Sequence, residues 1–147
     1  YRRTDSSSPW SFMKRWSLFM KDNVLHKIEN DNDFIKLVFP ITKGAQWYDQ
    51  AYYGTDIENR LGSKMKYEYK EVNAPFQGRN ANFDSTAQVL YYDYEDAINK
   101  DFFKEIYAKN IGLVYKEEYQ LEKSPSDDWN KPQRGFSIRY HYMNHAK

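Results

Sequence analysis

Residues 136–142 read Phe-Ser-Ile-Arg-Tyr-His-Tyr, and this stretch decides the fold class. Apolar or aromatic residues alternate with polar ones, a period of two that is typical of a β-strand with one buried and one solvent-exposed face. The same alternation recurs along most of the 147 residues, which include 14 Tyr, 9 Phe and 4 Trp. The sequence therefore predicts an all-β protein whose core is built largely from aromatic rings.

Alternation and turn residues together predict about eight strands joined mainly by short turns. The expected strands cover residues 10–20, 24–29, 34–39, 65–72, 86–94, 101–109, 113–122 and 136–143. Residues 101–109 also fit one face of a helix, but the neighbouring pattern favours a strand. Because consecutive strands with short connections pair antiparallel, we expect an antiparallel meander that forms a barrel or a sandwich.

Three of these segments carry more detailed expectations. Residues 34–39 are almost continuously apolar and end at Pro40, which is typical of a strand buried on both faces. In 113–122, the side chains of Leu113, Tyr115, Tyr119 and Leu121 are expected to face one way. Residues 73–75 read Asn-Ala-Pro and predict a turn that closes the strand over 65–72.

The length is that of one domain. Residues 1–9 are polar and rich in turn-forming types, so we interpret them as a linker or the continuation of a missing N-terminal part. Residues 10–147 are expected to form a single β-domain. Within it, residues 42–63 contain Gly44, Gly54 and Gly62 and predict one long aromatic loop, the kind of segment that often carries function.

Charge and composition exclude several classes of protein. The chain has 22 basic and 21 acidic residues, so it offers no basic footprint for nucleic acid. It has no cysteine, which excludes disulfides and thiolate chemistry. No apolar run approaches the roughly 20 residues of a transmembrane helix. No motif points to a cofactor.

The aromatic loop holds the best candidate site. Its candidates for ligand binding are Trp47, Tyr48, Asp49, Tyr52 and Tyr53. Aromatic faces beside carboxylates bind sugars, and two carboxylates across a cleft can hydrolyse glycosidic bonds. The favoured interpretation is an ordinary loop whose rings cover one end of the fold.

Two further carboxylates of that loop, Asp56 and Glu58, enter the glycosidase alternative, but no residue is assigned as catalytic. His141 and His145 are four residues apart, a spacing that brings two metal ligands together on a helix but not on a strand. Acidic pairs in 30–33 and 127–128 could ligate Ca²⁺, yet turn formation explains them equally well. No metal site is predicted.

Several short segments, taken in order, carry a family resemblance. They are Tyr-Arg-Arg-Thr-Asp-Ser at 1–6, Ile-Lys-Leu-Val-Phe-Pro at 35–40, Gly-Ala-Gln-Trp at 44–47, Phe-Asp-Ser-Thr at 83–86, Glu-Ile-Tyr-Ala-Lys-Asn-Ile-Gly-Leu-Val-Tyr-Lys-Glu at 105–117, and Arg-Gly-Phe at 134–136. Over essentially its whole length, the chain resembles an uncharacterised family of secreted or lipid-anchored cell-envelope proteins from Bacteroidota. Family members often carry cysteines before the last strand, whereas residues 124–133 here have none.

The resemblance implies a place in the cell envelope: associated with the outer membrane, periplasmic or on the surface. It also implies a missing N-terminal portion that could bear a lipid anchor. The family has no established activity, so no catalytic residue is transferred. The leading hypothesis is a non-enzymatic accessory or interaction subunit with a protein partner, in an outer-membrane complex. The alternatives are a β-barrel that binds a small glycan or lipid and, less favoured, a glycan-active enzyme.

Overall fold

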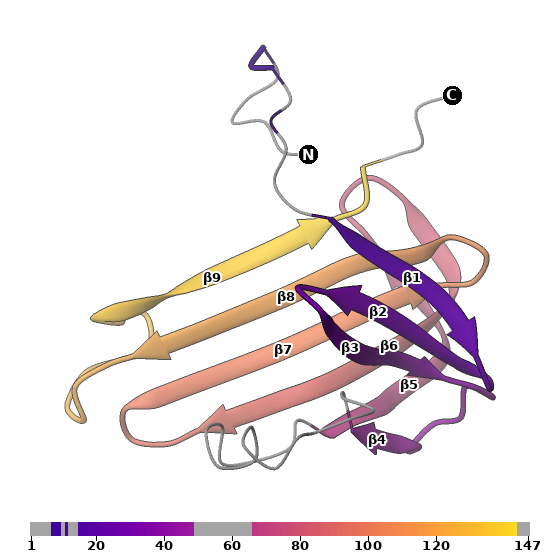
Figure 1. Ribbon diagram of the computed structural model, residues 1–147. Coiled ribbons are helices and arrows are strands. Elements are labelled where there is room, and N and C mark those ends of the chain that lie inside the picture. The colour runs from indigo at the N-terminus through magenta and orange to yellow at the C-terminus, as the bar shows by residue number, and fades with distance from the viewer. Residues whose placement is uncertain (1–6, 10, 12–14, 49–65, 144–147) are drawn as a thin grey trace.

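The computed structural model describes residues 7–9, 11, 15–48 and 66–143, and these form two antiparallel sheets without a helix (Figure 1). The smaller sheet has the order β1-β2-β3, with strands β1 (Trp16–Lys21), β2 (Val24–Glu29) and β3 (Asn32–Val38). The larger sheet runs in chain order through β4 (Gln46–Tyr48), β5 (Lys66–Gln77), β6 (Asn82–Glu95), β7 (Asn99–Ala108), β8 (Gly112–Glu122) and β9 (Arg134–His141). The predicted all-β antiparallel fold is confirmed. Of the two predicted architectures, the described strands form the sandwich, and they do not close into a barrel.

Tight turns shape the smaller sheet. Asp22 and Asn23 have φ of 49° and 62°, and Asn30 and Asp31 have φ of 51° and 61°. Two consecutive left-handed residues are typical of two-residue hairpin turns, whose twist matches that of the flanking strands. The predicted turn at 22–23 is confirmed, and the next turn is short enough for β3 to begin at Asn32, earlier than expected.

The turn predicted at 73–75 is wrong, because β5 continues through it to Gln77. The register between β5 and β6 shifts on either side of Ala74, and Asn73 takes a φ of 55°, so the Asn-Ala-Pro segment forms β-bulges instead of a turn. Pro75 is tolerated since β4 pairs only with the first residues of β5, which leaves Pro75 on a sheet edge.

A bulge also overturns the expected common face in β8. Ile106 pairs with Tyr115 while Tyr107 pairs with Leu113, so Val114 is the extra residue. Tyr115 therefore packs on the face that carries Ile106, and Leu113 lies on the opposite face. The Leu113 side chain therefore points toward the smaller sheet.

The main core lies between the two sheets. Its buried members are Leu37, Trp47, Tyr67, Tyr69, Ala87, Val89, Tyr91 and Phe103. A second cluster, with Phe83, Ile106 and Val114 at its centre, covers the other face of the larger sheet. In β3 only Leu37 is fully buried, so the prediction of a strand buried on both faces is wrong.

The sheets are tied together through β3. The Tyr69 hydroxyl donates to the carbonyl oxygen of Val38 (2.9 Å) and accepts from the Val38 amide (3.1 Å). The indole N–H of Trp47 donates to the carbonyl oxygen of Ile35 (3.2 Å), and Lys36 forms an ion pair with Glu105 (2.8 Å). These contacts join β3 to β4, β5 and β7, and they define one firmly closed side of the sandwich.

Candidate functional site

The residues that the sequence predicted as a binding site do not share one environment in the structure. Trp47 and Tyr48 belong to β4, so a short strand interrupts the predicted loop. Trp47 is only 8% exposed and stacks on Tyr67 (ring centroids 5.7 Å apart), whereas Tyr48 is half exposed. Asp49, Tyr52 and Tyr53 lie outside the described residues. Trp47 therefore serves the core, and no site can be assembled around it from the described residues.

The other residues that sequence reasoning singled out are equally dispersed. His141 lies in β9 with its ring against Tyr115, while His145, Asp56 and Glu58 fall outside the described ranges. The described part of the chain holds no group of three metal-ligating side chains. Within the same residues, no helix has the length and hydrophobicity needed to cross a bilayer.

A different site emerges between the two sheets, where a cleft of about 980 Å³ opens beside the core. Its apolar walls include Trp16, Leu18 and Leu25 from the smaller sheet. Leu113 and Tyr140 come from β8 and β9 of the larger sheet. Pockets for small molecules have volumes of roughly 300–1,000 Å³, so the cleft has room for a substantial ligand.

The cleft exists because the sheets diverge away from β3. Trp16 and Leu18, on the outermost strand of the smaller sheet, are each 50% exposed. Across the cleft, Leu113 is 46% exposed and Tyr140 is more exposed still. These side chains point toward the opposite sheet without being covered by it.

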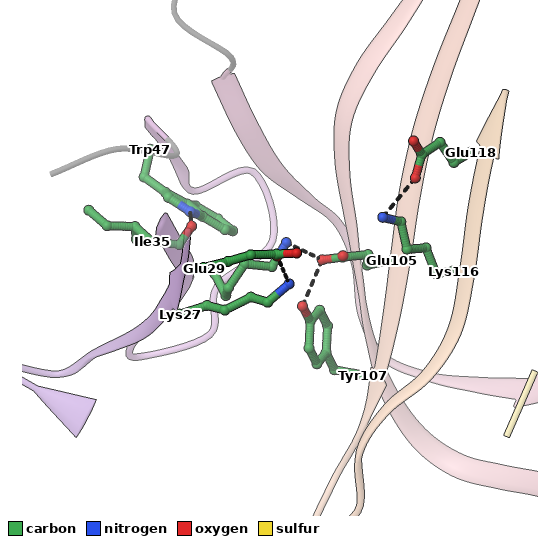
Figure 2. Close-up of polar contacts among 9 residues, drawn as sticks. Lys27, Glu29, Ile35, Trp47, Glu105, Tyr107, Lys116 and Glu118 are labelled. Carbon is green, nitrogen blue, oxygen red and sulfur yellow. Dashed lines mark hydrogen bonds and ion pairs between the residues drawn. The ribbon is translucent and has the colours of Figure 1, made fainter. Parts of the chain in front are cut away.

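A buried ion pair forms part of the cleft wall. Glu105, on β7, is 4% exposed and pairs with Lys36, while the Tyr107 hydroxyl donates to the same carboxylate (2.7 Å). Figure 2 shows Tyr107 reaching toward Glu105. Burial acts to raise the pKa of Glu105, but Lys36, the hydroxyl and nearby Lys116 outweigh it and hold this pKa below its usual range. Burial, followed by the Glu105 charge, raises the pKa of Tyr107 well above its ordinary value.

Two more lysines reach this region, one from each sheet. Lys27 on β2 pairs with Glu29 and lies 5.5 Å from the centre of the Trp16 ring. Lys116 on β8 pairs with Glu118 (2.8 Å), as Figure 2 shows. Their ammonium groups lie on either side of Glu105 in that view. Lys27 and Lys116 thus line the same cleft from opposite sheets.

Polarity changes along the strands. In the larger sheet, three neighbouring strands place Glu105, Lys116 and Tyr140 side by side on one face. The next position along the same face is occupied by Tyr107, which pairs with Leu113. In the smaller sheet, Leu18 pairs with Lys27, and Leu25 lies one step from it.

One same-face step along a strand is two residues, or about 6.7 Å. Apolar and charged side chains therefore lie within one step of each other along both walls, so the cleft presents an amphipathic lining.

Sequence reasoning missed this site, although one signal was available. Phe103, Glu105 and Tyr107 share a strand face, and a carboxylate between two aromatic residues on a buried face needs a partner. Lys36 carried no comparable signal, since only tertiary packing brings its partner Glu105 to it. Comparisons of the chain with protein-family models, with curated proteins and with solved structures return no significant match.

Proposed function

We propose that the protein is a non-enzymatic binding module that holds a ligand with a large apolar body in the cleft between its sheets. The main support is the pair of apolar surfaces that face each other without packing, Trp16 and Leu18 on one side and Leu113 and Tyr140 on the other. Exposed apolar surface of this kind carries a free-energy cost of about 25 cal/mol per Å² relative to burial. A ligand that fills the cleft removes that cost.

The state of Glu105 supports a binding role over an acid–base one. A glycosidase acid needs a carboxyl group whose pKa is raised. Burial alone would raise it, but pairing with Lys36 and Tyr107 lowers the pKa of Glu105 and keeps it ionised. The glycan-active alternative depends on Asp49, Asp56 and Glu58, which lie outside the described residues.

Titration with N-phenyl-1-naphthylamine, an uncharged dye that fluoresces in apolar surroundings, tests the proposal. We expect a saturable rise in fluorescence with one dye per chain. Leu113→Asp should abolish it, because the variant places a charge on the cleft wall. Ile98→Asp is the matched control, as Ile98 is similarly exposed but does not line the cleft. Equal loss in both variants, or no saturable binding by the wild-type protein, contradicts the proposal.

A second candidate function is the accessory or interaction subunit of a cell-envelope complex, supported by β9. Phe136, Ile138 and Tyr140 share one face of this strand, and all three are exposed. β9 is the last strand in the order of the larger sheet, and such strands present backbone groups for pairing with another chain. The envelope location, the lipid anchor and the outer-membrane partner rest on the family resemblance alone.

An affinity pull-down of natively expressed protein from membranes in mild detergent, read by mass spectrometry, tests this candidate. A stoichiometric outer-membrane protein should appear with the wild type and be lost in Ile138→Asp. Ile111→Asp, at an exposed position outside β9, should retain it. Recovery of the protein only as a free monomer outside the envelope would exclude this function.

A further inference from the structure

The cleft lining is unbalanced in charge, and this asymmetry restricts the ligand. Among the described residues that line it, four are lysines and one is a carboxylate: Lys27, Lys36, Lys109, Lys116 and Glu105. Lys27 and Lys116 pair with Glu29 and Glu118, which do not line the cleft; when these two carboxylates are counted with the lining, four lysines stand against three glutamates, an excess of one positive charge. The surface offered to a ligand therefore carries more positive than negative charge.

Not all of these lysines are equally available to a ligand. Lys36 is largely buried, pairs with Glu105, and lies 5.2 Å and 5.3 Å from the ring centres of Tyr67 and Tyr91. It is held by the core. Lys27 and Lys116 retain more solvent exposure, and an ammonium group has three N–H donors, of which one carboxylate partner does not use all.

Lys27 and Lys116 belong to opposite sheets, and each has a leucine at the next position on its own strand face. For Lys27 this is Leu25 in β2, and for Lys116 it is Leu113, on the other side of the bulge in β8. A ligand that follows this arrangement has a compact polar head between the two lysines and an apolar chain over the leucines. Glu105 is only 4% exposed and accepts from Lys36 and Tyr107, so a cationic head reaches it less readily than an anionic head reaches the more exposed Lys27 and Lys116.

We propose that the cleft binds an anionic amphiphile, with a carboxylate or phosphate head between Lys27 and Lys116 and its acyl chain between the sheets. This inference rests on the proposed binding function and adds the class of ligand. Hydrogen bonds in which both partners are charged are about twice as strong as neutral ones. The head thus bridges the two sheets at the level where they diverge.

A series of ligands with the same chain separates the two proposals. Calorimetric titration of the full chain uses dodecanoate, dodecyl phosphate, dodecanol and dodecyltrimethylammonium below their micelle-forming concentrations. We expect at least one anion to bind about tenfold more tightly than dodecanol, which corresponds to one charge-assisted hydrogen bond. Preference between dodecanoate and dodecyl phosphate distinguishes a fatty-acid from a phosphate head.

Variants then assign the head to the two lysines. Lys27→Gln and Lys116→Gln should each reduce anion affinity toward that of dodecanol, with a much smaller change in dodecanol affinity, and thermal unfolding of each variant checks that it is folded. Lys116→Arg should restore anion binding. Lys43→Gln is the matched control, because Lys43 is highly exposed, pairs with Glu71 and does not line the cleft.

The possible failures are distinguishable. If dodecanol or the cation binds as tightly as both anions, the anionic head is excluded while the binding function stands. If anion affinity exceeds that of dodecanol but is unchanged in both Gln variants, the assignment to Lys27 and Lys116 is wrong. If no member of the series binds, both the ligand class and the cleft function fail.

Discussion

The two sides of this sandwich are built from the same alternating pattern but are packed differently. On the closed side, β3 lies against β4, β5 and β7, and Leu37 is 6% exposed. On the open side, β1 faces β8 and β9 across the cleft, and Leu18 is half exposed although it also points inward. An inward-facing apolar residue is therefore not the same as a core residue, because a second surface must cover it.

The contacts that cross between the sheets explain the difference. Each of these contacts has one partner in β3: the hydrogen bond of Tyr69, the hydrogen bond of Trp47 and the ion pair of Lys36. The lysine of β2 and the lysine of β8 instead pair with carboxylates on their own strands. The closed side provides stability, and we infer that the open side provides binding.

The largest effect is expected from breaking the buried ion pair of Lys36 and Glu105, which ties β3 to β7 where the closed side meets the cleft. Lys36→Met leaves Glu105 buried without its main partner, and removal of one member of such a pair costs about 3–5 kcal/mol. Urea denaturation measures this loss. The double variant Lys36→Met/Glu105→Leu should recover most of it, since no charge is left uncompensated.

The matched control for that variant is Lys43→Met. Lys43 and Glu71 form an exposed pair on the protein surface, and such pairs contribute about 0–1 kcal/mol. A loss as large as that of Lys36→Met would mean that burial does not distinguish the two pairs.

A pair of identical substitutions on one sheet compares the two sides directly. Leu37→Ala should destabilise the protein by about 2–5 kcal/mol, because it opens a cavity in the core. Leu18→Ala should stay within about 0.5 kcal/mol, because its side chain is half exposed. Thermal and urea unfolding of both variants provide the check, and similar losses would show that the cleft is closed in solution.

The hydroxyl of Tyr69 should have a smaller effect. Tyr69→Phe removes two hydrogen bonds to Val38 and leaves partly buried backbone groups of β3 without this partner, at a cost of about 1–3 kcal/mol. Burial raises the pKa of Tyr69 to about 12, so its hydroxyl stays protonated throughout the neutral range. Tyr140→Phe, on the open side, should be neutral in the same denaturation experiment.

The pH dependence of stability is expected to be the mildest effect. The pKa of Glu105 is lower in the folded protein than its ordinary value of 4.5. Its contribution to stability is therefore complete above pH 4.5 and is lost as the pH falls through the folded-state pKa. Denaturation midpoints measured from pH 6 to pH 3 should fall more steeply for the wild type than for Lys36→Met/Glu105→Leu, and equal slopes would exclude Glu105 as the cause.

Several elements were predictable from local sequence alone. The strand predicted at 24–29 has the bounds of β2, and the short-range turn at 22–23 is confirmed. Residues 101–109, which fitted both a helix and a strand, form β7 nearly as expected. Here the period-two pattern and turn residues are sufficient because they depend on near neighbours.

The errors share a physical cause. The bulge at Val114, which reverses the face of Leu113, appears only when β8 is paired with β7. The passage of β5 through Pro75 depends on β4 beginning only at Gln46, opposite Glu68, which leaves the later residues of β5 at an edge. Neither pairing register nor edge position can be inferred from one segment, because both depend on a partner strand distant in sequence.

The sequence by itself determined the all-β class, the antiparallel meander and most turns, because backbone preferences and side-chain alternation act over a few residues. Only the tertiary structure decided that two sheets diverge from β3 and leave Leu18 and Leu113 facing an open cleft. It also decided that Lys36 meets Glu105 and that Lys27 and Lys116 approach from opposite sheets. Burial and ion pairing depend on the distance between residues far apart in the chain, and that distance exists only once the sheets have packed.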